Sequence, residues 1–123
     1  PIHAVGPNRP STCKGPHGLA MVALCPMGMS CNCLAAPEKY AQVAQILGVE
    51  PMGTCLDTAR EGIDAMYELL ADLNIAPGLE AHGVPRDALE GTAERAAGAK
   101  RLMDNNPRKA NAKQLLALLE EHY

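Results

Sequence analysis

The residues Gly15-Pro16-His17-Gly18 lead directly into the apolar run Leu19 to Leu24. Proline fixes the backbone and glycine frees it, so this stretch predicts a turn followed by the start of a buried helix. We expect the helix to run from Gly18 to about Cys33, and we expect Pro26 to kink it or to end its first section. His17 then stands at a helix entrance, held by the turn before it.

A second histidine, His3, precedes the turn that holds His17. A neutral imidazole is the commonest protein ligand for a transition metal. Zinc and non-haem iron sites usually take three or four protein groups. The residues alone therefore predict that His3 and His17 form, at most, half of a metal site.

Two further helices are marked by their ends. Pro37 suits the first turn of a helix that runs to Leu47 and stops at Gly48. Thr54 is a good N-cap with Asp57 in a capping-box position, so a second amphipathic helix of about five turns begins there. The positions expected on the buried faces of these helices are Tyr40, Val43, Ala44, Leu47, Leu56, Ile63, Met66, Tyr67, Leu70 and Leu73.

The last third of the chain predicts a connector over 74–83, which contains the lone histidine His82, and then two more helices. The first covers 85–102, and its glycines weaken it enough that it can divide. Asn111 caps the second, which ends at Tyr123. Residues 1–14 carry three prolines and one glycine and are expected to be mostly loop. The predicted fold is all-α: one domain over 1–123, with a loop-rich segment over 1–17 and a bundle of five to six helices over 18–123.

Composition supports helices over a sheet. Hydrophobic residues make up 47% of the 123 residues, while aromatic residues are only 2%, with no Phe and no Trp. Strands are usually enriched in aromatic and β-branched residues, so a core of Leu, Ala, Val, Ile and Met favours packed helices. The net charge of −3 without a basic cluster argues against nucleic acid as a partner. No apolar run reaches membrane-spanning length and no signal pattern opens the chain, so we expect no membrane partner and a cytoplasmic location.

Five cysteines fall at positions 13, 25, 31, 33 and 55. The odd number and the absence of a secretory signal argue against a disulfide framework. We interpret them as reduced cysteines that act as small apolar fillers, and we expect the methionines at 21, 27 and 29 to belong to the core. The alternative is a soft-metal site in which Cys13 or Cys25 joins the two histidines.

Short segments spread over most of the chain resemble one known family, in its order and with roughly its spacing. They are Pro16-His17-Gly18-Leu19-Ala20, Leu24 with Pro26, Asn32, Pro37-Glu38-Lys39-Tyr40-Ala41, Leu47-Gly48, Gly83-Val84-Pro85 and Asn106-Pro107-Arg108. In these the chain resembles the C-terminal helical, metal-binding part of the iron-containing (group III) alcohol dehydrogenases. The resemblance implies that His3 and His17 match the last two of four metal ligands. The other two, an aspartate and a histidine, would belong to a segment before Pro1.

The same resemblance implies the chemistry. In the family a divalent metal polarises an alcohol or carbonyl oxygen, and a nicotinamide held by a second lobe exchanges the hydride. Iron or zinc is the expected metal, and NAD(P) is expected only together with that second lobe. This sequence has no glycine-rich strand-to-helix turn for a pyrophosphate. Pro7 also stands where many members have another histidine near the substrate. We therefore expect the chain by itself to be inactive.

Three hypotheses follow. The favoured one is the metal-binding lobe of an iron-type alcohol dehydrogenase, whose partner is the nucleotide-binding lobe or a second copy of the chain. The next is a stand-alone, non-catalytic helical module for binding or scaffolding. The last is a small metal-binding protein that uses His3, His17 and a cysteine, in which Cys13→Ser would abolish binding.

Overall fold

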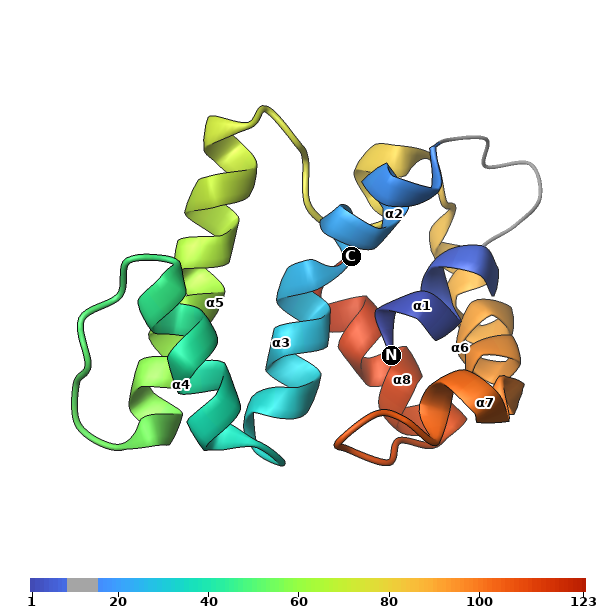
Figure 1. The fold of residues 1–123 in the computed structure, drawn as a ribbon. Coiled ribbons are helices and arrows are strands. Elements are labelled where there is room, and N and C mark those ends of the chain that lie inside the picture. The colour runs from blue at the N-terminus through green and yellow to red at the C-terminus, as the bar shows by residue number, and fades with distance from the viewer. Residues whose placement is uncertain (9–15) are drawn as a thin grey trace.

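The computed structural model describes residues 1–8 and 16–123, and the regular elements in this part are helices (Figure 1). Six of them have seven or more residues, so the predicted all-α fold of five to six helices is confirmed. The helices are α1 (Ile2–Val5), η1 (Gly6–Asn8), α2 (His17–Ala23), α3 (Cys25–Cys33), α4 (Pro37–Ile46), α5 (Cys55–Asp72), η2 (Glu80–His82), η3 (Arg86–Ala88), α6 (Leu89–Gly98), α7 (Lys100–Met103) and α8 (Ala112–Glu121).

The start of the chain differs from the prediction. Residues 2–8, expected to be mostly loop, form α1 and η1. The carbonyl oxygen of Pro1 accepts hydrogen bonds from the amides of Ala4 and Val5, at 2.8 and 3.0 Å. Both of these side chains are 0% exposed, and this burial stabilises a turn that the local prolines and glycines would not. The rest of the expected loop, residues 9–15, lies outside the described residues.

The apolar helix predicted from Gly18 to about Cys33 is divided near Pro26, as expected. α2 ends before Leu24, whose φ of −94° and ψ of 0° turn the chain, and α3 begins at Cys25 with Pro26 in its first turn. Proline has no amide hydrogen to donate, so it is tolerated in the first turn of a helix but not in its interior. α3 is buried over most of its length, including the predicted core residues Met27 and Met29.

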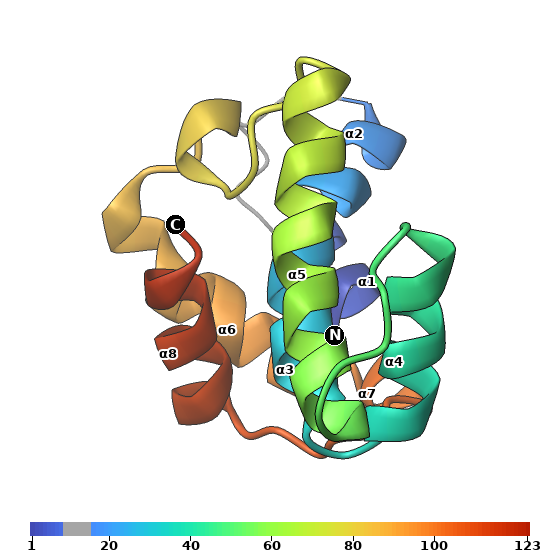
Figure 2. The same cartoon turned by 90° about the vertical axis from the view of Figure 1, so that its left-hand side faces the viewer.

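α4 and α5 form a closely packed pair (Figure 2). The predicted capping box is confirmed: the Asp57 amide donates to Thr54 Oγ1 at 3.2 Å, and the Thr54 amide donates to Asp57 Oδ2 at 2.8 Å. Gly48 ends the preceding helix with a φ of +96°. Two of the predicted buried positions are wrong, because Val43 is 36% exposed and Leu73 is 57% exposed.

The predicted division of the 85–102 helix is confirmed. The chain leaves helical geometry at Ala99, between α6 and α7, where ψ is 62°. Asn111 caps α8 as expected, and Gln114 completes a capping box with it, so the last helix begins where predicted and ends at Glu121.

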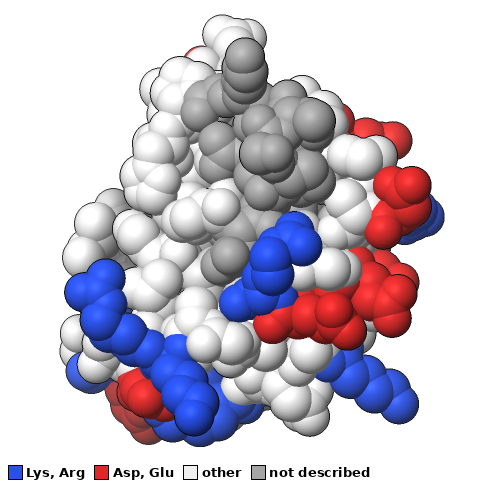
Figure 3. Space-filling model, turned by 90° about the vertical axis from the view of Figure 1, so that its right-hand side faces the viewer, with Lys and Arg blue, Asp and Glu red and all other residues white. Residues whose placement is uncertain are grey.

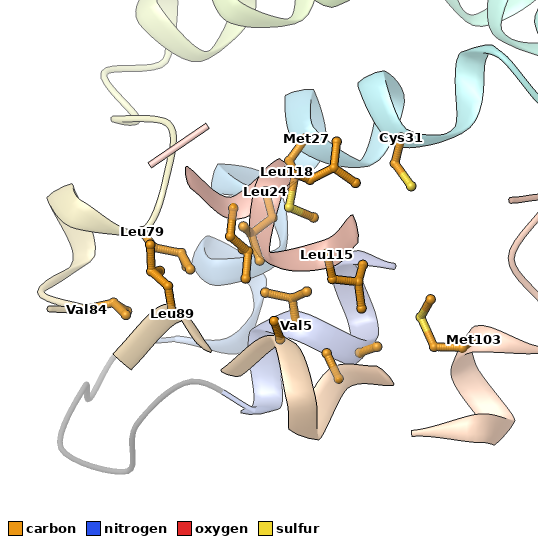
Figure 4. Packing of buried hydrophobic residues seen from close by; sticks show 14 residues of the cluster. Val5, Leu24, Met27, Cys31, Leu79, Val84, Leu89, Met103, Leu115 and Leu118 are labelled. Atoms are coloured by element: carbon orange, nitrogen blue, oxygen red, sulfur yellow. The ribbon is translucent and has the colours of Figure 1, made fainter. Parts of the chain in front are cut away.

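The core gathers between α1, α3, α6 and α8. Figure 4 shows Leu24, Met27 and Leu118 coming together near Val5 and Leu115. The remaining core members are Ala4, Cys31, Leu79, Val84, Leu89, Ala93, Ala96, Met103 and Leu119. In Figure 1, α3 stands between α1, α6 and α8 on one side and the α4–α5 pair on the other. α3 is therefore the element that joins the two sides of the bundle.

A buried pair of amides fixes α3 against the turn before α8. Asn32 Nδ2 donates to Asn106 Oδ1 at 2.9 Å, and Asn106 Nδ2 donates back to Asn32 Oδ1 at 2.7 Å. The second hydrogens of the two amide groups go to the Tyr40 hydroxyl and to the Arg108 carbonyl. Because a buried amide without partners costs about 1–3 kcal/mol, this reciprocal pair selects one register of α3.

We expect Gly62→Ala to destabilise the fold. A Cβ atom at Gly62 would lie 2.6 Å from the Cβ of Ala44 and 3.0 Å from its Cα, so α4 and α5 would have to separate. The expected loss is about 1–3 kcal/mol of unfolding free energy, measured by urea denaturation, despite the better helix propensity of alanine. The matched control is Gly98→Ala, where a Cβ meets no described atom within 4 Å and stability should be unchanged or higher. Equal effects at both sites would contradict this packing.

We also expect stability to fall on the acid side because of His122. Its Nδ1 shares a hydrogen bond of 2.8 Å with the Tyr67 hydroxyl, and its Nε2 is buried with no partner among the described residues. Burial lowers the pKa of His122 below its ordinary value of 6.5, and the carboxylate of Glu121 opposes this in part.

The sign follows from proton linkage. Below about pH 6.5 the unfolded chain binds a proton that folded His122 resists, so the unfolding free energy drops as the pH falls. Denaturation curves between about pH 7.5 and 5 measure this effect. His122→Gln should remove this part of the pH dependence, whereas His82→Gln should retain it. The same pH dependence in wild type and His122→Gln would exclude His122 as its source.

Candidate metal centre

The two histidines singled out from the sequence lie side by side. His3 belongs to α1 and His17 begins α2, and the centroids of their rings are 5.9 Å apart with the ring planes tilted by 56°. Both side chains are exposed. Their neighbours are not: Ala4 and Val5 next to His3, and Ala20 and Met21 in α2, are buried and anchor the two short helices. Anchored backbones thus present two imidazoles to the outside of the bundle.

This spacing is slightly wider than that of two ligands of one tetrahedral divalent ion. With metal–nitrogen distances of about 2.0–2.1 Å, the centroids of two imidazoles on such an ion stand about 5.2 Å apart, so the two rings would have to approach by less than about 1 Å. A complete site needs more ligands. Within residues 1–8 and 16–123, no group of three His, Cys, Asp or Glu side chains is arranged to hold a metal ion. In the described part of the chain His3 and His17 therefore lie close together, and metal binding by this pair stays a prediction.

The other candidates fall elsewhere. Asp57 and Asp64 lie on the exposed side of α5. Cys25 donates to the Met21 carbonyl at a sulfur–oxygen distance of 3.6 Å, and no metal-type cluster of described residues includes it. The alternative ligand Cys13 and the neighbouring Gly15 lie outside the described residues. A Cβ atom at Gly18, next to His17, would meet nothing within 4 Å among the described atoms.

Most of the remaining sulfur and histidine expectations hold. Cys31 and Cys33 are buried free thiols that fill space in the core, whereas Cys55 is exposed and does not. His82 has a structural role, since its Nε2 lies 2.8 Å from the Ala76 carbonyl oxygen. His122 was not singled out from the sequence, because nothing local marks a histidine near the end of a helix as buried.

The surface adds two observations. On the face over α6 and α7, positive and negative side chains lie against one another in groups, and uncharged surface lies between the groups (Figure 3). None of the helices in the described ranges combines the length and the apolar character that a membrane crossing requires.

Sequence and fold comparisons agree on the class of protein. Residues 1–123 match the family described as "Fe-containing alcohol dehydrogenase family, C-terminal". The fold matches a crystal structure of 1,3-propanediol oxidoreductase with a TM-score of 0.89 and 30% identity, over 99% of this chain and 32% of that one. It also matches an alcohol dehydrogenase from Oenococcus oeni with a TM-score of 0.88 and 27% identity, over the same shares. The class is thus the C-terminal helical domain of the Fe-containing alcohol dehydrogenase family.

Named relatives support the same assignment. The chain is 47% identical over 125 residues to the sulfoacetaldehyde reductase of Bilophila wadsworthia, and 30% identical over 123 residues to the 1,3-propanediol dehydrogenase of Klebsiella pneumoniae. In both cases the match covers 99% of this chain and 32% of the relative. The chain belongs to the Fe-containing alcohol dehydrogenase family, and it spans about a third of the length of these relatives.

We expect the two histidines to respond to metal as a pair. In a titration with Zn²⁺ followed by NMR of the histidine rings, the signals of His3 and His17 should shift together. His17→Ala should weaken binding at least about tenfold, which is 1.4 kcal/mol, because one of two ligands is removed. His82→Ala is the control and should leave the affinity unchanged. Equal losses in the two variants would show that this pair is not the binding site.

Proposed function

We propose that this chain supplies the helical, metal-binding lobe of an NAD(P)-dependent alcohol dehydrogenase or aldehyde reductase, in which His3 and His17 are two of the metal ligands. The observation that carries the proposal is the 5.9 Å approach of two exposed imidazoles from separate helices. Membership of a family named for iron and alcohol dehydrogenation supports the same role.

The bound metal, iron or zinc, would act as a Lewis acid on the alcohol or carbonyl oxygen of the substrate. The residues of this chain would hold and orient it. Each histidine is carried by a short helix that buried residues anchor, Ala4 and Val5 in α1 and Ala20, Met21 and Ala23 in α2, so little conformational entropy is lost when the imidazoles bind. Pro7 is exposed and cannot transfer a proton, so proton transfer would fall to groups elsewhere.

The remaining ligands and the nicotinamide would come from a nucleotide-binding lobe. In this proposal that lobe precedes Pro1 in the same protein or is a separate chain, and a second copy of the present chain is the other candidate partner. The named relatives include reductases of sulfoacetaldehyde and lactaldehyde and a 1,3-propanediol dehydrogenase. We therefore propose small aldehydes or alcohols with a polar substituent as the substrate class.

A stand-alone, non-catalytic helical module is the second candidate. It is favoured by the buried core that the described helices form with one another and by the lack of a third metal ligand among the described residues. Such a module would fold tightly without metal or nicotinamide and would bind neither of them.

The deciding experiment starts from the DNA that precedes the codon for Pro1. We expect an open reading frame that continues upstream and encodes a glycine-rich nucleotide-binding lobe. The protein expressed from the whole frame and loaded with iron or zinc should reduce short aldehydes with NADH or NADPH. His17→Ala should lower kcat by more than about 100-fold, beyond the 10–100-fold that outer-shell changes cost. His82→Ala should not.

A reading frame that begins near Pro1, or a full-length protein that oxidises no nicotinamide, would contradict the proposal. Activity that survives both His17→Ala and removal of the metal with a chelator would contradict the assigned role of this histidine.

A further inference from the structure

The two segments that carry the histidines meet one helical turn away from the imidazoles. Gly6 follows His3 by three residues and keeps right-handed helical geometry, with a φ of −54° and a ψ of −51°. Met21 follows His17 by four residues in α2. Residues three or four apart lie on the same side of a helix, so Gly6 shares a side with His3. Met21 likewise shares a side with His17.

Met21 packs directly on Gly6. A Cβ atom built on Gly6 would overlap Met21 Cε and would lie 3.4 Å from Met21 Sδ. The terminal methyl group of Met21 therefore occupies the space that any side chain at position 6 would need. Leu24 Cδ1 borders the same space, at 3.9 Å from the built atom. Because position 6 is a glycine, η1 and α2 can approach this closely.

The backbone of Met21 is held at the junction of α2 and α3. Its carbonyl oxygen accepts a hydrogen bond from the Leu24 amide at 3.3 Å and another from the Cys25 thiol at 3.6 Å. Its side chain is only 7% exposed. A buried side chain has little free space to move into, so a change at this contact is passed to the elements on either side. The separation of η1 and α2 thus depends on the length of the Met21 side chain.

Other contacts hold α1 on its opposite side. A Cβ atom built on Gly28 of α3 would lie 2.8 Å from Ile2 Cγ2. Pro1 and Ile2 also line a pocket of about 390 Å³ between α1, α3, α4, α5 and the turn before α8, and neither Gly6 nor Met21 is among its lining residues. These contacts set α1 relative to α3, whereas the contact of Met21 with Gly6 sets the same segment relative to α2.

We propose that Met21 is a positioning residue of the candidate metal centre: its thioether, packed on Gly6, sets how closely the two histidine rings approach. This inference rests on the proposed function, because the rings that it positions are the proposed metal ligands. Met21 acts through the backbones of two short helices and is not itself a ligand. Side chains of a metal site must be held to within about 0.5 Å, so one methyl group at this contact is a large change.

The test moves one methyl group across the contact. Met21→Leu removes the Cε methyl group, Gly6→Ala adds a methyl group at nearly the same place, and the double variant does both. Two quantities are measured by NMR: the Zn²⁺ affinity from the histidine ring signals, and, without metal, the nuclear Overhauser effect between the ring protons of His3 and His17. Each single variant should weaken Zn²⁺ binding at least about fivefold and reduce the ring effect, whereas the double variant should restore both to within about twofold of wild type.

Two control variants separate positioning from a general loss of stability. Gly18→Ala adds the same methyl group next to His17, where a Cβ atom meets no described atom within 4 Å, so it should change neither quantity. Gly62→Ala forces α4 and α5 apart, so it should lower the urea midpoint and still leave both quantities unchanged.

Three results would overturn the proposal: no ring effect in wild type, an unchanged ring effect in both single variants, or a double variant that loses as much as the two single variants together. The metal-free measurement decides this inference even where Zn²⁺ does not bind. Absence of Zn²⁺ binding at the two histidines of wild type would contradict the proposed function alone. Zn²⁺ binding there that is equally tight in the single variants would contradict this inference alone.

Discussion

The burial of α3 is the constraint on which the rest of the structure depends. This helix is apolar on nearly every side, so it must be covered all round. The α4–α5 pair covers one side, and α1 and α8 cover another. The exchange of hydrogen bonds between Asn32 and Asn106 then fixes the rotation and height of α3, because a shifted helix would leave two amides buried without partners.

The candidate metal centre and the pocket both follow from how α1 is held against α3. The inward residues Ala4 and Val5 leave His3 at the surface beside His17. Pro1 and Ile2, at the start of the same helix, form part of the pocket wall. One short helix therefore carries His3 and borders the pocket.

Much of the fold could be predicted because its helix ends are marked by local chemistry. Pro26 and Pro37 lack the amide hydrogen that a helix interior requires, so each lies in the first turn of a helix. Thr54 and Asn111 accept hydrogen bonds from backbone amides in the first turns of α5 and α8, and this marks where those helices begin. Both histidines could be named as candidates from the residue types and from the family resemblance. Their close approach could not, since it depends on how α1 and α2 pack against elements distant in the sequence.

The sequence by itself determined the helical class, the main helix boundaries and the family, because these depend on residue type and on short-range spacing. The tertiary structure decided the features that depend on which residues become buried. It made α1 a helix although the prolines and the glycine around it predict a loop, and it left Val43 and Leu73 exposed although their spacing places them on apolar faces. The pocket also exists only in three dimensions, since four helices and a turn contribute its walls. The physical reason is that periodicity shows which side chains share a face, while the energy of burial depends on which partner covers that face.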